Sequence, residues 1–315
     1  MLANTPSLDE LTVFTSLVRL GDLRALALQT GVPSKVIAER IKDLETKLAI
    51  EIFEKDESGK LSPDKRLVLT EQGESLFTSG RKVLDTAEAM MDGMSHRNAI
   101  PKGTLYICSS TGFSRKVLGP ILSKFQQVYP DLEIQLEALD RRINLLEEGY
   151  HLDIRVGSEN EPGLCYRNIA SNYRILCASP KYLKDAPPLK TPADLQNHRC
   201  LVIRERDQQP RLWSLQGPNN GANMRVRGAM SSNMGEIVKQ WTLEGNGIAL
   251  RSLWDVREEL ESGELVRVLP FYSQQADIVA AYPERLSDSV KIQVCLEFWP
   301  KAKCCGNTLT PTAKN

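Results

Sequence analysis

Hydrophobic residues recur at helical spacing through the first fifty residues and predict three short helices. Apolar positions between residues 8 and 20 precede Gly21, which ends a helix at low steric cost. Residues 23–30 form a second amphipathic run, and the turn at residues 30–33 combines a glycine with a proline of fixed φ. Residues 33–48 place apolar side chains at i, i+4 and i+8, so we expect the third helix to pack on one side only.

The opposite face of this third helix is polar and available to a partner. A helix about 10 Å wide fits the major groove of DNA, where the base edges carry a full donor and acceptor code. The candidate base-reading residues are Ser34, Lys35, Val36, Glu39, Arg40 and Lys42.

A polar and apolar alternation over residues 51–70, around a turn rich in Asp, Ser, Gly and Pro, predicts a hairpin that follows the helices as a wing. Basic side chains on a wing typically contact phosphate, which adds affinity without sequence information. For any single lysine, a solvated hairpin explains the pattern equally well. The candidate phosphate contacts are Lys55, Lys60, Lys65 and Arg66.

A long helix is predicted over residues 71–98, where apolar and small residues recur at steps of four and three. The hairpin cannot cover such a seam, so pairing with the same helix of a second copy is the favoured interpretation. An ordinary core helix is the alternative. Two paired copies would present two reading helices with two-fold symmetry and would require an inverted-repeat site. The candidate dimerisation residues are Leu76, Gly80, Val83, Ala87, Met90 and Met94.

Residues 96–103 break the helical pattern, and the chain then alternates strands with amphipathic helices. This alternation predicts sheets covered by helices over residues 99–302. We expect lobe I at about residues 103–170 and 273–301 and lobe II at about residues 171–272, joined by crossing strands around a hinged cleft. Predicted elements include helices at 141–148 and 287–299, and strands at 224–232 and 264–270. Residues 303–315 resemble a disordered tail.

Charge limits how the first third can bind DNA. Residues 1–98 hold 13 Lys and Arg against 16 Asp and Glu, a net charge of −3. DNA binding therefore depends on a local basic patch rather than on global attraction, which disfavours a nonspecific coat protein.

Composition narrows the remaining function classes. With 315 residues and 41% hydrophobic content the chain has room for two or three domains, and no apolar run reaches the length of a membrane span. The seven cysteines show no CxxC pair and, without a secretion signal, are expected to be reduced thiols in the cytoplasm. Buried or inert thiols are the favoured interpretation, and a redox switch is the alternative. The sequence has no GxSxG, Walker A or GxGxxG motif and no metal-ligand spacing, so we expect no enzyme, metal or cofactor.

The chain resembles the LysR-type transcriptional regulators. The segments LDELTVFTSLVRLGDLRALALQTGV, RIKDLETKL and LVLTEQGESLF resemble the winged helix-turn-helix of that family over residues 8–73. FQQVYPDLEIQLEALDRRINLLEEGYHLDIRVG, CASPKYL, LQNHRCL and EGNGIALRSLWDVREELESGELVRVLP resemble its effector-binding domain. The resemblance implies an α/β protein with an N-terminal winged helix-turn-helix, a linker helix and a two-lobed, periplasmic-binding-protein-like effector domain.

The same resemblance implies double-stranded promoter DNA, a small organic anion, a second copy of the chain as dimer or tetramer, and RNA polymerase as partners. The alternative is a cytoplasmic two-lobed α/β ligand-binding protein or enzyme that does not bind DNA, since the fold alone hosts both.

The expected effector site follows the first strand, where hydroxyls and free backbone N–H groups at a helix start can hold a carboxylate. Plain N-capping by one of these hydroxyls is the alternative. Arg155 is either a cleft cation or, by slight preference, the partner of Asp153 or Asp140 in a salt bridge. Asp140 and Arg141 follow the second predicted strand, and the positions in the opposing lobe come from the family comparison. The candidate effector-binding residues are Ser109, Ser110, Thr111, Gly112, Phe113, Asp140, Arg141, Arg155, Ile203, Arg204, Ser232, Asn233 and Gly247.

Overall fold

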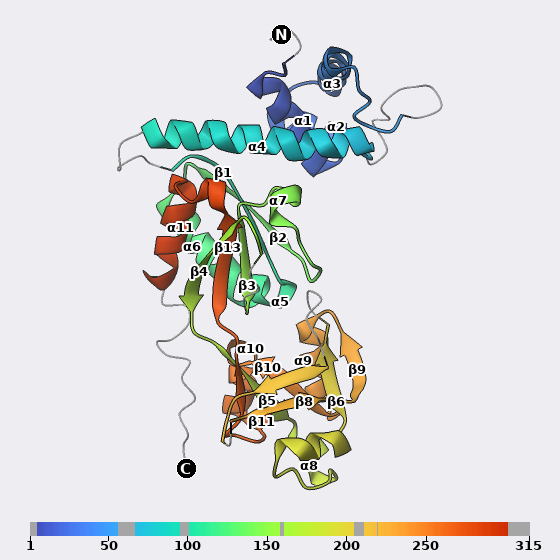
Figure 1. Cartoon of the computed structure of the whole chain (residues 1–315), viewed down its shortest axis with the longest axis vertical. Coiled ribbons are helices and arrows are strands. Elements are labelled where there is room, and N and C mark those ends of the chain that lie inside the picture. Colours follow the sequence, from blue (N-terminus) through green and yellow to red (C-terminus); the bar gives the residue numbers. More distant parts are fainter. Residues whose placement is uncertain are drawn as a thin grey trace. The chain divides into compact units, whose positions relative to one another are not determined.

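A computed structural model describes residues 5–55, 67–94, 101–157, 161–204, 211–218 and 220–301 of the chain. They fall into two compact units, one made by the first 98 residues with Leu146–Gly149 and one made by the rest of the chain (Figure 1). We call the helices and the wing of the first unit the head. None of the described helices is both long and apolar enough to cross a membrane.

Local capping chemistry sets the ends of the helices in the head. Ser7 and Glu10 form a capping box at the start of the first helix, and Gly21 ends it in the left-handed conformation with φ 65°. Asp22 then caps the second helix by accepting a hydrogen bond from the backbone N–H of Arg24 at 2.7 Å. The helices described here are α1 (Leu8–Leu20), α2 (Leu23–Thr30), α3 (Ser34–Leu48) and α4 (Glu71–Met94).

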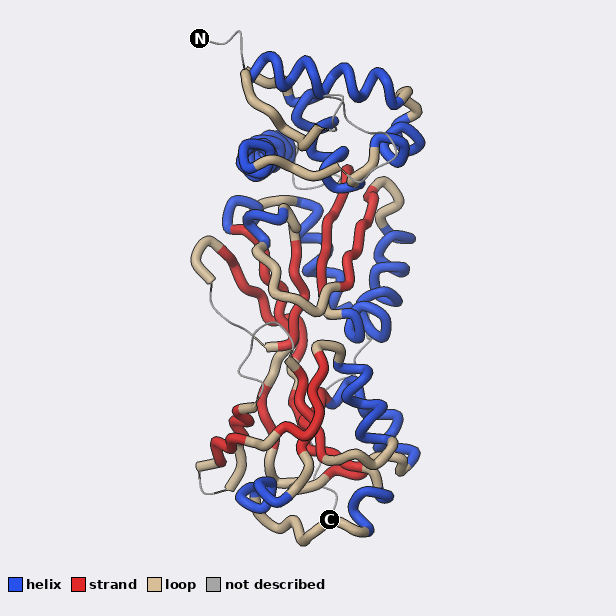
Figure 2. The backbone as a smooth tube through the Cα atoms, turned by 90° about the vertical axis from the view of Figure 1, so that its right-hand side faces the viewer, coloured by secondary structure: helices blue, strands red, loops and turns tan. Residues whose placement is uncertain are grey.

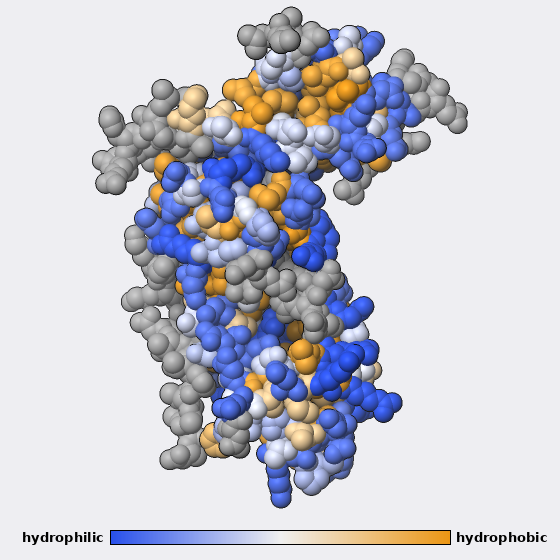
Figure 3. All heavy atoms as spheres, in the orientation of Figure 1, coloured by the Kyte–Doolittle hydropathy of each residue, from blue (hydrophilic) through white to orange (hydrophobic). Residues whose placement is uncertain are grey.

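One apolar core joins these helices and confirms the three predicted apolar faces. The ring of Phe14 in α1 is fully buried and packs edge-on against Phe53 at 6.1 Å and against Phe77 of α4 at 6.3 Å between centroids. The buried members of the core are Phe14, Leu17, Leu23, Leu26, Ile37, Ile41, Leu44, Ile52 and Phe53. Apolar side chains also reach the outside of the head (Figure 3). Leu28 of α2 is 87% exposed.

The two ends of the predicted wing lie side by side at the edge of this core. Phe53 and Leu69 form an antiparallel bridge, and the backbone N–H of Glu54 donates to the Val68 carbonyl at 2.9 Å. Residues 56–66, which include the predicted turn, lie outside the described residues.

The apolar residues of α4 that were predicted to form the dimer seam lie in two different environments, one packed against the head and one exposed. Gly80 is buried against α1, and a Cβ built there would come within 3.1 Å of Leu11 Cδ2. Leu76 packs on the core of the head, whereas Val83 and Met90 are 48% and 61% exposed. The predicted seam is therefore corrected at Leu76 and Gly80, which face their own chain because α1 covers this end of α4.

The second unit begins with a five-stranded mixed sheet. Strand β1 runs parallel to β2 and β3, and the late strand β13 inserts antiparallel between β3 and β4. The sheet order β2-β1-β3-β13-β4 comprises β1 (Gly103–Ser109), β2 (Leu132–Ala138), β3 (Leu152–Val156), β4 (Leu164–Ala170) and β13 (Ile278–Pro283). Helices α6 (Gly119–Val128) and α11 (Val290–Lys301) pack together beside it, with Phe125 and Phe298 at 5.2 Å between centroids (Figure 1). The other helical segments of this lobe are α5 (Thr111–Phe113), a π-helical turn (Ser114–Leu118) and a short 3₁₀ turn (Glu284–Leu286). Helix α7 (Leu145–Glu148) falls almost entirely in the first unit.

The second lobe is built on a sheet of order β11-β5-β10-β6-β9, with β12 also paired to β5 and a separate β7-β8 ribbon. Its strands are β5 (Tyr173–Ala178), β6 (Cys200–Ile203), β7 (Leu212–Leu215), β8 (Ala222–Arg225), β9 (Gly228–Ser232), β10 (Ile248–Ser252), β11 (Val266–Arg267) and β12 (Ser273–Gln275). Its helices are α8 (Pro180–Lys184), a 3₁₀ helix (Pro192–Asn197), α9 (Gly235–Leu243) and α10 (Leu253–Ser262).

The chain crosses between the two lobes from β4 to β5 and again from β12 to β13, as predicted (Figure 2). Asn172 is fully buried at the first crossing. Its side-chain amide donates to the carbonyl of Ala276, at the second crossing, at 2.8 Å. The two crossings are thus tied together, and they form the hinge of the two-lobed domain.

Several predicted elements differ from the structure. The helix predicted at 141–148 is reduced to Leu145–Glu148, and the strand predicted at 264–270 to Val266–Arg267. The strand predicted at 224–232 divides into β8 and β9 because β8 pairs with β7 whereas β9 pairs with β6. The helix predicted at 287–299 begins later, at Val290.

Candidate functional sites

The outward face of α3 carries most of the residues predicted to read DNA. Lys35, Val36, Glu39 and Lys42 are exposed, and Ser34 is half-buried at the first helical position. This face lies opposite the buried side chains of α3, so it can meet a partner without disturbing the core.

Two of the predicted DNA contacts are held by carboxylates of the head. The Arg40 guanidinium pairs with Asp9 of α1 at 3.2 Å, with both side chains largely exposed. Lys55 lies 3.3 Å from both Glu45 and Glu51, and the hydrogen bond to Glu51 is the main cause that raises the pKa of its ammonium.

The exposed pairs of Arg40 with Asp9 and of Lys55 with Glu51 are weak, so these two cations can exchange those carboxylates for phosphate. Lys60, Lys65 and Arg66 lie outside the described residues, as does the side chain of Met94.

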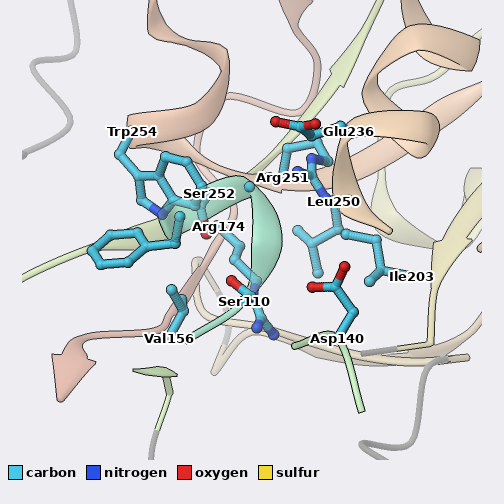
Figure 4. A pocket seen from close by; sticks show the side chains of 13 residues that line it. Ser110, Asp140, Val156, Arg174, Ile203, Glu236, Leu250, Arg251, Ser252 and Trp254 are labelled. Atoms are coloured by element: carbon cyan, nitrogen blue, oxygen red, sulfur yellow. The ribbon is translucent and has the colours of Figure 1, made fainter. Parts of the chain in front are cut away.

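A pocket lies between the two lobes of the second unit (Figure 4). It encloses about 440 Å³ of empty space, including the part open to solvent. The lining residues are Ser110, Gly112, Phe113, Asp140, Val156, Arg174, Ile203, Gly235, Glu236, Leu250, Arg251, Ser252 and Trp254. Both lobes contribute, so a ligand here would contact each of them across the hinge.

One wall of the pocket is aromatic. Phe113 of α5 meets Trp254 of α10 edge-on at 5.1 Å between centroids and stacks on Trp299 at 6.3 Å. Trp254 comes from the second lobe but packs against the apolar core of the first lobe. This contact couples the start of α10 to the first lobe.

The predicted anion site at the helix start is occupied by the chain itself. The carboxylate of Asp140 accepts a hydrogen bond from the backbone N–H of Thr111 at 3.0 Å. A ligand anion in that position would meet this negative charge at close range. The backbone N–H of Thr111 is therefore already bonded to Asp140, so this one predicted donor is not available to a ligand carboxylate in this structure.

The cations of the pocket are Arg174 and Arg251. Figure 4 shows the Arg174 guanidinium directed toward Ser110 and Asp140 across the pocket. Arg251 is buried and its Nε donates to Asp255 of α10 at 2.9 Å. Asp255 also faces Lys239 at 3.6 Å, so the guanidinium of Arg251 is held in a fixed position by a charged cluster behind the pocket.

The rim of the pocket carries an ion pair between the lobes. Glu236, at the start of α9, accepts hydrogen bonds from Arg115 of the π-helical turn, one of them from Nε at 2.8 Å. The bond to Glu236 raises the pKa of the Arg115 guanidinium. Lys116 next to it donates to the backbone carbonyl of Asp255 at 2.9 Å.

Several predicted effector residues serve the framework instead. Arg155 pairs with Asp153 at 3.0 Å and Glu161 at 2.7 Å, which confirms the salt-bridge interpretation. The Ser109 hydroxyl donates to the Ile154 carbonyl within the first sheet. These side chains are buried between strands and do not line the pocket.

Five further predictions fall on residues that do not line the pocket. Arg141, Arg204 and Asn233 are exposed on loops, while the Ser232 hydroxyl accepts from the backbone N–H of Met234 at 3.1 Å. Gly247 is packed against another backbone, because a Cβ there would lie 2.2 Å from the Arg199 carbonyl oxygen.

The sequence reasoning missed the pocket residues at the ends of lobe II strands. Arg251 and Ser252 end β10, which runs parallel to β6. Ligands in α/β sheets bind beyond the carboxyl ends of parallel strands. That rule, applied to β10, would have found them, whereas Arg174, Glu236 and Trp254 carry no comparable local signal.

Four of the described cysteines, Cys108, Cys177, Cys200 and Cys295, are buried, and Cys165 is half-buried. Burial raises the pKa of Cys177, Cys200 and Cys295 to about 12. No cluster of three or more metal-ligating side chains exists among the described residues.

Comparison with known proteins gives one consistent result. A profile for the LysR substrate binding domain matches residues 98–302. The HTH-type transcriptional regulator DmlR of Escherichia coli (strain K12) is 40% identical over 295 residues, 94% of this chain and 94% of that protein. The HTH-type transcriptional activator TtdR of the same strain is 37% identical over 298 residues, 95% and 94% of the two chains. The solved structure of CrgA, a LysR-type transcriptional regulator from Neisseria meningitidis, is 25% identical with a TM-score of 0.57 and covers 94% of this chain and 98% of CrgA.

Proposed function

The chain belongs to the LysR family of transcriptional regulators, and we propose that it binds an inverted-repeat promoter site as a homo-oligomer under the control of a small organic anion in the inter-lobe pocket. Its curated relatives are named as regulators and not as enzymes, in agreement with the absence of catalytic motifs. The observation that carries the proposal is the outward face of α3, which is exposed on a helix whose other side is fully packed.

DNA binding by this head depends on a few local cations. The net charge of −3 over residues 1–98 gives no general attraction to phosphate. Lys35 and Lys42 lie on the exposed face of α3. Arg40 can also bind phosphate if a DNA phosphate replaces Asp9 as the partner of its guanidinium. Affinity should therefore fall steeply with salt, as counterion release requires.

Self-association would use the later part of α4. Val83 and Met90 are exposed and Ala87 between them is half-buried, one to two turns apart on the same helix. Pairing this stripe with a second copy would bury these side chains and double the number of reading helices. The two-fold axis between the copies would then match an inverted repeat.

The effector site combines two guanidiniums with hydroxyls and a hinge. Arg174 and Arg251 bring positive charge to the pocket, and the hydroxyls of Ser110 and Ser252 offer donors beside them. A small carboxylate that bridges these groups would bind both lobes at once. It would favour one lobe arrangement over another, and this population shift would reach the DNA-binding heads.

A mobility-shift titration tests the proposal. The full chain is titrated against the DNA upstream of its own gene at two salt concentrations, with a scrambled duplex as competitor. Specific retention that weakens with salt supports the regulator, whereas retention of no fragment favours a ligand-binding protein without DNA activity.

The effector part is tested with a panel of small mono- and dicarboxylates and a thermal-shift readout. The Arg174→Gln variant should lose the response, and Lys184→Gln, on the exterior of the second lobe, should keep it. An Arg174→Gln protein that responds like the wild type would refute the anion site.

A further inference from the structure

The geometry of α3 puts a carboxylate at the centre of the reading face. Successive helical residues are rotated by about 100°. Ile37, Ile41 and Leu44 define the buried side, and this rotation places Glu39 and Lys35 on the opposite side. Val36, which is 38% exposed, lies at the flank of the same face.

These three residues also lie in the first two turns of α3. Reading helices contact base edges through their N-terminal residues. Arg40, the other cation of these two turns, is turned toward Asp9 at 3.2 Å. The exposed side chains that meet the bases are therefore one ammonium, one branched apolar group and one carboxylate, beside the half-buried hydroxyl of Ser34 at the first helical position.

A carboxylate in the major groove has few acceptable neighbours. It only accepts hydrogen bonds, and phosphate oxygens repel it. Among base edges in the groove, only the amino groups of cytosine and adenine are donors, and adenine sets an N7 acceptor beside its donor whereas cytosine does not. The guanine paired with cytosine places its O6 acceptor next to that amino group, but the cytosine edge itself has no acceptor, so cytosine is the better partner for Glu39. An apolar side chain such as Val36 gains contact from the methyl group of thymine.

We infer that Glu39 selects cytosine and Val36 selects thymine in each operator half-site. The inference rests on the proposed DNA-binding function and assigns the base chemistry that this function would read. It predicts a half-site defined by pyrimidine features at these positions.

In vitro selection from random duplexes tests the assignment without a known operator. The full-length wild type should enrich half-sites with an invariant cytosine. Glu39→Gln should enrich adenine at that position, because a glutamine amide pairs with adenine N6 and N7. Glu74→Gln, a matched change at an exposed carboxylate of α4, should enrich the wild-type sequence.

A second measurement tests Val36 on the selected duplex. Replacing the half-site thymine by deoxyuridine removes only the methyl group. This change should weaken wild-type binding several-fold in a mobility shift and weaken Val36→Ala binding less, because alanine reaches the methyl group with a smaller apolar surface.

The outcomes separate the inference from the function it rests on. If the wild type enriches a site but Glu39→Gln enriches the same base, Glu39 is neutralised by Lys35 within the helix and the cytosine assignment is wrong. If deoxyuridine has no effect on the wild type, the thymine assignment is wrong. If the wild type enriches no site, the proposed DNA-binding function itself fails.

Discussion

Replacing Asp255 by asparagine is expected to destabilise the effector domain strongly. The Asp255 side chain is 3% exposed and is paired with Arg251, whose side chain is 7% exposed. Lys239 lies 3.6 Å from the same carboxylate and 2.7 Å from Glu259. The substitution preserves volume but leaves two poorly hydrated cations with a single carboxylate.

The magnitude follows from the burial of the pair. Removing one partner of a buried ion pair costs about 3–5 kcal/mol, because the remaining charge is uncompensated. Asp255 also lies in the first turn of α10, where a negative charge adds roughly 0.5 kcal/mol through the helix dipole. For a domain of this size each kcal/mol lowers Tm by about 2–4 °C, so Tm should fall by about 10 °C or more.

Tryptophan fluorescence during urea unfolding measures this loss. The four tryptophans are Trp213, Trp241, Trp254 and Trp299. All four belong to the second unit, so the signal reports that unit alone.

Glu258→Gln is the matched control on the same helix. The Glu258 side chain is 77% exposed in its pair with Lys116, and its loss should cost about 1 kcal/mol or less. If Asp255→Asn is no more destabilising than this control, the cluster does not hold Arg251 in place and the account of the pocket is wrong.

Three further changes have defined outcomes. Gly80→Leu would force a side chain against Leu11 and should lower the free energy of unfolding of the head by about 1–3 kcal/mol. Retention of DNA in a mobility shift should fall, while the urea transition followed by tryptophan fluorescence should not change. Full retention of DNA would contradict the packing of α1 on α4. The buried Cys177 thiol has its pKa raised from 9.0 to about 12, so its contribution to stability is complete below pH 9.0 and is lost toward pH 12, at about 1.4 kcal/mol per pH unit. The urea midpoint should fall less between pH 8 and 10 in Cys177→Ala than in the wild type, and equal falls would refute this. Asn172→Ala removes the amide that ties the two lobe crossings and should speed amide exchange at Ala276 relative to Ala222; unchanged exchange would show that the crossings are held by other bonds.

Local sequence signals predicted the helices of the head well. Gly21 and Gly31 both adopt positive φ at helix ends, and Asp22 caps α2. A helix-ending glycine and an N-cap affect only the few residues next to them, so the local sequence is enough to recognise them. The apolar spacing of Ile37 and Ile41 likewise reports directly which side of α3 is buried.

The misplaced predictions depend on contacts between distant segments. Asp140 reaches the N–H of Thr111, 29 residues away, and Asp9 reaches Arg40, 31 residues away. Strand β13 enters the first sheet more than 100 residues after β4. A pattern read along one segment contains no information about such partners.

The same dependence on distant contacts explains which pocket residues were predicted and which were missed. Ser110 and Asp140 were found because they follow predicted strands of lobe I. Glu236 and Trp254 were missed because only the docking of α9 and α10 against Arg115 and Phe113 brings them to the site. Pocket residues on helices of the opposite lobe are set by tertiary packing, which the local pattern does not encode.

A DNase footprint on the DNA upstream of the gene, with the full-length protein and with or without an anion identified by the thermal-shift panel, tests the central claim most directly. The account predicts two protected half-sites related by two-fold symmetry, with centres about 10 base pairs or a multiple of that apart. It also predicts that the anion changes their protection in the wild type but not in Arg174→Gln. Protection of a single unsymmetrical site, or a pattern indifferent to the anion in the wild type, would contradict it.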